Sequence, residues 1–323
     1  MKVSLQRITE ISGATGFRPD VIEKVVYLLT ILNALNGHPF LKGRWALKGG
    51  TAINLFVLMM PRLSVDIDLN YTGAIDRETM VEERPKVEKA LQDVFSREGL
   101  KVKRVPTEHA GGKWRLTYPG ALVSSGNLDV DLNFMFRRPL WDIKESDSHV
   151  LGTYQAKNIP VMDIHELAAG KLAALFSRHQ ARDLFDAHQI LRRKDLVIDK
   201  LRLAFVVYGA MNRKDWRTIS FGDISYDIDD LKQKLIPVMQ GRDVSSSMGI
   251  SPVGRNLVEE CRDNLSSVYP LADNEVKFLD LILNKGEIEP SLLTADAGLQ
   301  GRIKQHPMLQ WKAMNVRKHL GIK

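Results

Sequence analysis

Apolar and polar residues alternate strictly from Val65 to Asn70, so that Asp66 and Asp68 fall two positions apart. Successive side chains of a strand point to opposite faces, and the segment therefore predicts a strand with both aspartates on one face. The same alternation recurs from Leu128 to Phe136. A second strand with carboxylates on one face is thus predicted.

Helical periodicity predicts three longer elements. Residues 21–36 carry apolar positions at helical spacing after Asp20, and Glu23 adds the pattern of a capping box. Asp76 to Gly99 is amphipathic, with charged residues on the side expected to face water. From Asp163 onward the chain is rich in alanine and leucine, which predicts a mostly helical remainder.

Shorter patterns complete the predicted elements. Three further strands are predicted at Arg44–Leu47, Lys101–Val105 and Trp114–Tyr118. A buried helix ended by a proline is predicted at Thr51–Met60. A glycine turn is predicted at Gly111–Gly112 and a loop at Gly241–Gly254. Together the elements predict an α+β fold with two domains. A mixed sheet with its helices is expected in residues 1–155, and a mainly helical domain in residues 156–323.

The chain is mildly basic. Forty-six lysine and arginine residues against 39 aspartate and glutamate residues leave a net charge of +7. This excess fits a polyanionic partner such as nucleic acid or a nucleotide, and it fits an ordinary basic surface equally well. The carboxyl end is the most basic part, because no acidic residue follows Leu299 while six cations do: Arg302, Lys304, Lys312, Arg317, Lys318 and Lys323.

Cysteine content and hydropathy exclude several classes of protein. Cys261 is the only cysteine, which excludes an internal disulfide and a site of several thiolates. No apolar run approaches the ~18 residues that span a bilayer, and the first residues lack the apolar core of a signal peptide. We expect a cytoplasmic protein with no membrane partner.

The stretch from Trp45 to Asn70 carries the candidate chemistry. Gly49 and Gly50 lie between a predicted strand and a predicted helix that begins at Thr51. Glycines let the backbone approach phosphate oxygens, and the N–H groups that open a helix attract anions. The motif is weak alone, but with the alternating aspartates that follow it predicts a nucleoside triphosphate site.

The aspartates suit a metal ion. Mg²⁺, or Mn²⁺, takes oxygen ligands, usually one or two carboxylates together with substrate phosphates. Asp66 and Asp68 would lie about 7 Å apart along one strand face. Asp129 and Asp131 on the second alternating strand are both candidates for a third carboxylate. A metal-assisted transfer of a nucleotidyl group is the predicted chemistry.

Two stretches carry a resemblance to a known family. LKGGTAINLF and RLSVDIDLN resemble the GG[S/T] and [DE]-x-[DE] signatures of polymerase-β-like nucleotidyltransferases, and in detail those of the AbiEii/AbiGii toxin family. HPMLQWKAMNVRKHL is similar to the family's ending, so the resemblance runs from about Asp20 to Leu320. Further positions match the family's motifs: Lys48, Arg62 and Ser64, then Lys171, Arg178, Arg182, Asp183 and Asp186.

The resemblance implies a role for each matched residue. It implies a polymerase-β-like core and catalytic roles for Asp66, Asp68, Lys171 and Asp183. It implies metal ligands at Asp66, Asp68 and Asp131, the last because Leu132-Asn133 follows it as in the family pattern. Nucleotide binding is implied for Lys48, Gly49, Gly50, Thr51, Arg62, Ser64, Arg178, Arg182 and Asp186.

The later motif also has a geometric interpretation. If Glu166 to Arg192 formed one unbroken helix, Lys171, Arg178 and Arg182 would lie within roughly 40° around its axis as a cationic stripe facing triphosphate oxygens. A break near Ser177 to Gln180 would rotate the two halves of the helix and weaken that stripe. The alternative is an internal salt-bridge cluster of the arginines with Asp183 and Asp186.

The resemblance implies the toxin half of a two-gene toxin–antitoxin or abortive phage infection system. Such a toxin would transfer a nucleoside monophosphate from a nucleoside triphosphate to an acceptor hydroxyl, in some relatives at the 3′ end of tRNA, and would have a cognate antitoxin encoded nearby. Two alternatives stay open. The protein could bind a triphosphate such as GTP without transfer, or it could nucleotidylate a protein or a small molecule.

Overall fold

The computed structural model describes residues 3–106, 110–241 and 250–321, and the chain forms two compact units. The first comprises Met1–Arg137, Ile143–Met162 and Gln233–Ser247, and the second comprises Arg138–Asp142, Asp163–Lys232 and Met248–Lys323. The sequence predicted one division, at residues 155/156, whereas the chain passes between the units several times.

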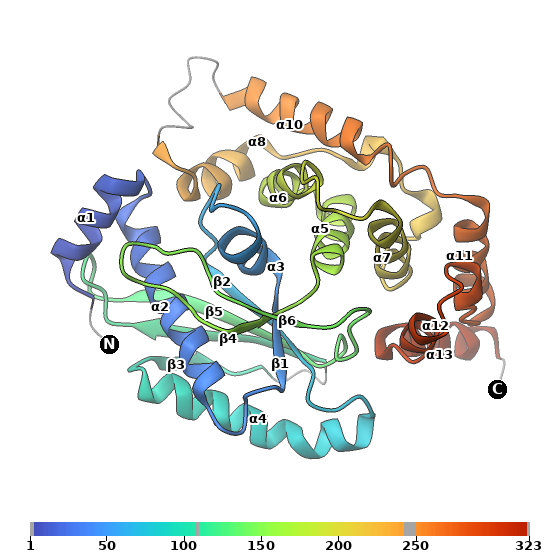
Figure 1. Ribbon diagram of the computed structural model, residues 1–323, viewed down its shortest axis with the longest axis horizontal. Helices are drawn as coiled ribbons and strands as arrows, with labels where there is room; N and C mark the ends of the chain where they lie inside the picture. Colours follow the sequence, from blue (N-terminus) through green and yellow to red (C-terminus); the bar gives the residue numbers. More distant parts are fainter. Residues whose placement is uncertain (1–2, 107–109, 242–249, 322–323) are drawn as a thin grey trace. The chain divides into compact units, whose positions relative to one another are not determined.

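A seven-stranded mixed sheet forms the centre of the first unit (Figure 1). Its strands lie in the order β3-β4-β5-β2-β1-β7-β6, with β2/β5 and β1/β7 parallel and the other pairs antiparallel. The bounds are β1 Trp45–Lys48, β2 Asp66–Tyr71, β3 Lys101–Arg104, β4 Gly111–Tyr118, β5 Gly126–Asn133, β6 Lys144–Ser146 and β7 Ile159–Val161. The predicted α+β class is confirmed.

The helices of the first unit lie on both faces of this sheet. They are α1 (Leu5–Thr15), α2 (Pro19–Gly37), α3 (Gly49–Ala52), which continues as the π-helical turn η1 (Ile53–Val57), and α4 (Arg77–Arg97). Trp114 of β4 contacts Phe95 of α4, and Tyr118 stacks on Tyr27 of α2, so α2 and α4 cover the apolar face. Helix α3 lies on the opposite, polar face (Figure 1).

Three local predictions are wrong in the first unit. Helix α2 begins at Pro19, before the predicted cap, and Glu23 accepts a hydrogen bond from the Ala121 amide instead of closing a capping box. The helix after the glycines ends at Val57 rather than Met60. Gly111 and Gly112 belong to β4, not to a turn. A Cβ at Gly111 would meet the Leu132 carbonyl oxygen at 2.0 Å, so glycine permits the close approach of β5.

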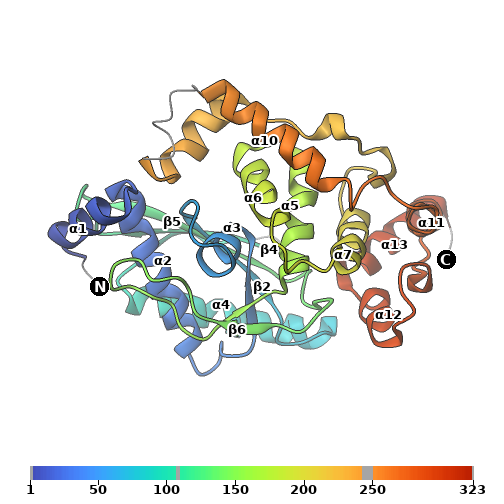
Figure 2. The same cartoon turned by 45° about the horizontal axis from the view of Figure 1, so that its top comes forward.

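The second unit is helical. Its helices are α5 (Ile164–Arg178), α6 (Ala181–Leu191), α7 (Ile198–Ala210), α8 (Ile228–Asp230), α10 (Ile250–Leu265), α11 (Asp273–Lys285), α12 (Ala297–Lys304) and α13 (Pro307–Leu320). Phe176, Phe205 and Trp216 form an aromatic centre with ring centroids 5.0 to 5.7 Å apart. Helix α10 lies beside α6 (Figure 2).

Short helical turns complete the described chain at Trp216–Thr218, Phe221–Asp223, Leu231–Leu235, Ile236–Val238 and Pro290–Leu292. Of the predicted loop at Gly241–Gly254, residues 242–249 lie outside the described residues. From Ile250 the chain is already helical, so that end of the prediction is wrong. Among the helices that are described, none is long and apolar enough to cross a membrane.

Candidate active site

Two rows of charged side chains cross the polar face of the sheet in the first unit. Residues paired directly on neighbouring strands point to the same face. The register of the strands therefore forms two rows, one crossing β1, β2, β5 and β4 and the other crossing β2, β5 and β4. The first row is Lys48, Asp68, Asp131 and Lys113, and the second is Asp66, Asp129 and Arg115. The two carboxylates of the first row thus lie between Lys48 and Lys113, and those of the second row end at Arg115.

The four carboxylates are not equivalent. Arg115 donates to Asp129 twice, from Nε to Oδ1 at 2.9 Å and from Nη2 to Oδ2 at 3.0 Å, and Lys113 Nζ lies 3.6 Å from Oδ2. These hydrogen bonds hold the pKa of Asp129 below its usual value. Asp129 pairs in register with Asp66 just as Asp131 pairs with Asp68, but Asp129 is neutralised by Arg115 and Lys113. The arrangement favours Asp131 over Asp129 as the third carboxylate.

The carboxylate oxygens of the two rows fit a hard divalent cation. Within the described part of the chain, no group of three or more His, Cys, Asp and Glu side chains is gathered closely enough to hold a metal ion by itself. Mg²⁺ needs only one or two carboxylates when substrate phosphates and water supply the other ligands. Asp66 and Asp68 are half-buried on β2, two positions apart, and are the candidates for that pair.

The glycine turn is fitted against the carboxylate strand. Gly49 has a φ of 70°, and a Cβ there would lie 2.3 Å from Asp68 Oδ2. The Thr51 hydroxyl donates to the Asp66 carbonyl oxygen at 2.5 Å, and Asn54 Nδ2 donates to the Gly50 carbonyl oxygen at 2.9 Å. The hydrogen bond of the Thr51 hydroxyl therefore links the start of α3 to β2.

Replacing Gly49 with alanine is expected to displace Asp68 and to abolish nucleotide transfer. Gly43→Ala is the matched control, because Gly43 has a φ of 76° with nothing within 4 Å of the added Cβ. Both substitutions carry the left-handed strain of about 1–2 kcal/mol, so thermal unfolding should show a loss in both, and a larger one in Gly49→Ala because its Cβ also meets Asp68. Only Gly49→Ala should lose transfer activity, and equal activities of the two variants would contradict this role of Gly49.

The segment entering β2 holds two of the predicted nucleotide-binding residues. Arg62 is only 2% exposed, its Nη1 donates to the Leu63 carbonyl oxygen at 3.0 Å, and its backbone forms a bridge with Met239. Ser64 is also buried. Both residues thus lie inside the first unit, where Arg62 holds the entry of the carboxylate strand. Lys48, half-buried at the end of β1, places Nζ 5.4 Å from the centre of the Phe136 ring.

The later motif forms a compact ionic cluster in the second unit. Lys171 Nζ lies 2.8 Å from Asp183 Oδ1 and 3.0 Å from Asp186 Oδ2, and Arg178 Nε lies 2.6 Å from Asp183 Oδ2. Lys171 and both aspartates are buried. Burial alone would raise the pKa of Asp183, but Lys171 and Arg178 hold it at about 2, so the carboxylate is ionised.

The cationic stripe predicted for one unbroken helix is wrong. Helix α5 ends at Arg178, His179 adopts a left-handed conformation with φ 51°, and α6 begins at Ala181. The break brings Asp183 of α6 against Lys171 of α5. This is the internal salt-bridge cluster that was the alternative to the stripe, except that Lys171 lies at its centre. Half-buried Arg182 lies on α6. The structure thus gathers one predicted set on the sheet of the first unit and the other between α5 and α6.

Lys113 and Arg115 are site residues that the sequence interpretation missed. They alternate on β4 with buried Trp114 and Leu116, at the same two-residue spacing as the aspartates. This alternation was visible in the sequence. The fact that β4 lies beside the carboxylates was not, because strand order is a tertiary property.

This fold with its carboxylate pair defines a class, the nucleotidyltransferases. The family model described as nucleotidyl transferase AbiEii toxin, Type IV TA system, matches residues 30–254, and the chain belongs to this family. It is therefore a nucleotidyltransferase toxin of a type IV toxin–antitoxin system. The match includes the charged rows on the sheet and the ionic cluster around Lys171, and it leaves α11, α12 and α13 outside.

A solved structure supports the fold over the whole chain. MenT4, a nucleotidyltransferase toxin from Mycobacterium tuberculosis H37Rv, is similar with a TM-score of 0.58 and 16% sequence identity. The similarity covers 98% of this chain and 99% of MenT4. No curated protein matches the sequence. At this identity the likeness establishes the architecture alone.

Proposed function

We propose that the protein transfers a nucleoside monophosphate from a nucleoside triphosphate to a hydroxyl at the 3′ end of an RNA such as tRNA, with Mg²⁺ or Mn²⁺ as the metal. One observation carries the proposal. Asp68 lies against the glycine turn on one side and pairs with Asp131 on the other. A phosphate-binding turn and oxygen ligands for a cation therefore adjoin within one unit.

The residues of the first unit have distinct roles in this proposal. Asp66 and Asp68 would hold the metal, with Asp131 as a further ligand, and the backbone of Gly49 and Gly50 would bind phosphate oxygens. When bound, Mg²⁺ neutralises phosphate charge and lowers the pKa of the attacking hydroxyl. In the reaction the acceptor oxygen bonds to the α-phosphorus, the bond to the bridging oxygen breaks, pyrophosphate leaves and the hydroxyl proton passes to solvent.

The cluster of the second unit would bind phosphate groups through its arginines. Arg178 is 54% exposed although it also pairs with Asp183, and Arg182 follows on α6. Lys171, Asp183 and Asp186 would fix the orientation of Arg178 from below the surface. An arginine held in place loses less side-chain entropy when it meets a phosphate, which favours binding.

The carboxyl-terminal cations offer limited support for an RNA partner. Arg302 pairs with Asp142 at 2.7 Å, while Lys312 and Arg317 donate to the carbonyl oxygens of Asn212 and Gly286. Half of the six cations are therefore used inside the second unit. Lys323 lies outside the described residues. A cognate antitoxin follows from the family.

Incubation with each α-labelled nucleoside triphosphate and total cellular RNA tests the proposal. We expect label to enter RNA with at least one triphosphate when Mg²⁺ or Mn²⁺ is present, and EDTA to abolish the incorporation. Titration calorimetry with the same triphosphates separates this result from the alternative of binding alone. Heat of binding without label in RNA, protein or small molecules would overturn the proposed transfer.

A further inference from the structure

Four cations occupy one side of the charged rows on the sheet of the first unit. They are called the basic strip here and consist of Lys101 and Arg104 on β3 with Lys113 and Arg115 on β4. No residue of strands β3 and β4 is acidic. The strip is therefore a local excess of positive charge, and the transfer reaction proposed above gives none of its four cations a role.

The register of the strands places the strip on the face that carries the carboxylates. Lys101 pairs with Thr117, and Arg104 pairs with Arg115 across a bulge. Lys113 and Arg115 pair in turn with Asp131 and Asp129 of β5. Since paired residues share a face, the strip extends the two rows from the carboxylates to the edge of the sheet.

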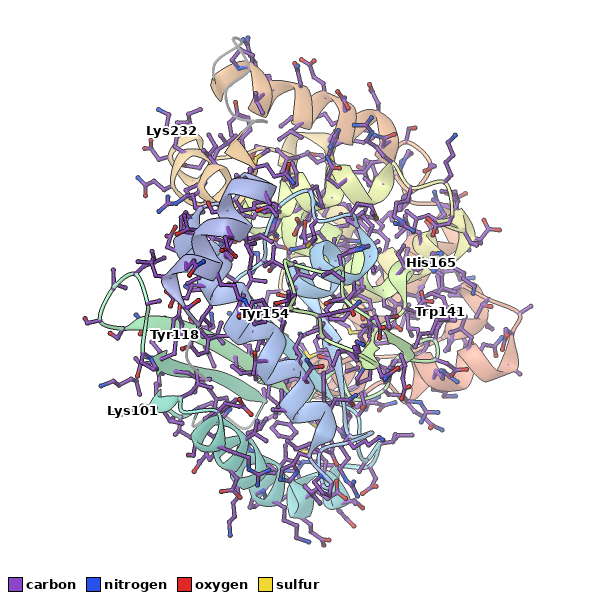
Figure 3. The ribbon with its side chains drawn as sticks, turned by 60° about the vertical axis from the view of Figure 1, so that its left-hand side comes forward. Lys101, Tyr118, Trp141, Tyr154, His165 and Lys232 are labelled. Carbon is purple, nitrogen blue, oxygen red and sulfur yellow. The ribbon has the colours of Figure 1, made fainter. Side chains whose placement is uncertain are left out.

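The strip is accessible to a large ligand. Lys101 and Arg104 are exposed, and Lys101 lies at the outer edge of the sheet (Figure 3). The side chains of Lys113 and Arg115 are 48% and 56% exposed, although both also approach Asp129. Neutralising Asp129 uses one of the two positive charges of β4. The remaining positive charge of the strip is therefore available to bind an external anion.

We propose that the basic strip binds the phosphate backbone of the acceptor RNA next to its 3′ end. This inference rests on the transfer reaction proposed above. The glycine turn follows β1, which lies beyond the carboxylates when viewed from β4. In-line displacement requires the attacking and leaving oxygens on opposite sides of the α-phosphorus. A triphosphate bound on the β1 side therefore leaves the β4 side for the acceptor.

The spacing of the strands agrees with this direction of approach. Strand β4 lies two positions from β2, or roughly 10 Å at the usual strand separation. An RNA phosphate held by Lys113 would leave the terminal nucleoside to extend over Asp131 toward the metal-binding pair. An RNA strand supplies several regularly spaced phosphates, which matches a strip of cations better than a single small anion does.

The test compares two double variants with the same change of charge. Lys101→Gln with Arg104→Gln removes two cations of the strip without touching Arg115, which holds Asp129. Lys86→Gln with Lys89→Gln is the control, because both lysines are exposed on α4, which packs against the opposite face of the sheet. Transfer kinetics and anisotropy of a fluorescein-labelled oligoribonucleotide are measured for both.

We expect the strip variant to raise the KM for RNA several-fold while the KM for the triphosphate and kcat stay at the wild-type values. Its log–log dependence of RNA affinity on salt should become shallower by about 0.7 for each lost phosphate contact. The control should leave every parameter unchanged. Thermal unfolding at the wild-type temperature in both variants confirms an intact fold.

Two further outcomes separate this inference from the reaction itself. Active transfer to RNA with the same RNA affinity and salt dependence in the strip variant would overturn the strip as the acceptor surface and leave the reaction standing. Transfer to a protein or a small molecule by the wild type would overturn both the RNA acceptor and the strip. Equal losses in the strip and control variants would show a general charge effect and would also overturn the inference.

Discussion

Replacing Asp68 with asparagine is expected to lower the rate of nucleotide transfer by about three orders of magnitude. The substitution keeps the size of the side chain and removes the charge beside the glycine turn, where Asp68 Oδ2 lies nearest to Gly49. A metal ion stabilises transition-state charge by several kcal/mol, and a loss of about 4 kcal/mol corresponds to about a thousandfold in rate. Asp66→Ala, at the other predicted ligand, should abolish transfer in the same way.

Asp129→Asn is the matched control for this prediction. It makes the same chemical change on the same face of the sheet, at a carboxylate that Arg115 already neutralises. We expect it to change the transfer rate by less than about tenfold, and Asp131→Asn to fall between Asp129→Asn and Asp68→Asn. Transfer rates with labelled triphosphate measure all three, and circular dichroism confirms the fold. Full activity of Asp68→Asn would refute the metal pair.

Replacing Lys171 with methionine is expected to destabilise the protein by about 3–5 kcal/mol, the usual cost of removing one partner from a buried ion pair. Methionine keeps much of the side-chain length but leaves Asp183 and Asp186, which are 2% and 0% exposed, without their shared cation. Arg178 pairs with Asp183 from the surface and cannot replace a buried ammonium group. Urea unfolding followed by fluorescence measures the change.

Two further variants show whether the loss of stability in Lys171→Met comes from the buried ion pairs. Lys304→Met removes an exposed lysine on α12 and should change stability by no more than about 0.5 kcal/mol. Lys171→Met combined with Asp183→Asn and Asp186→Asn removes the buried charges together and should recover much of the stability. If transfer stays absent in the stable triple variant, the cluster also serves the reaction. Wild-type stability of Lys171→Met alone would contradict a structural role for the cluster.

Local patterns accounted for much of the fold. The alternation around Asp66 and Asp68 defined β2, and the polar and apolar faces of α4 located that helix. Helix α2 was located by its run of apolar positions at helical spacing and is buried on nearly all sides. Strands β6 and β7 were missed, since three residues cannot display a period. The capping box at Glu23 was wrong because its carboxylate meets the distant Ala121 amide, a tertiary contact that replaces a local one.

The two candidate sites were predictable to different degrees. The glycine turn and the aspartates of β2 follow one another along the chain, so their proximity could be expected from the sequence. The cluster around Lys171 depended on whether one helix continued, and a left-handed residue at His179 ended it. A single backbone conformation thus changed a predicted cationic stripe into an ionic cluster in which Lys171, Asp183 and Asp186 are buried and Arg178 reaches the surface.

By itself, the sequence determined which side chains share a face of β2 and of β5, because alternation is a local property of a strand. It also determined, through its motifs, the family to which the chain belongs. Only the tertiary structure decided that these two strands pair in parallel with Asp68 beside Asp131, and that Arg115 neutralises Asp129. The pairing of β2 with β5, which are far apart in the sequence, depends on the packing of distant segments, and the alternation within either strand does not specify it.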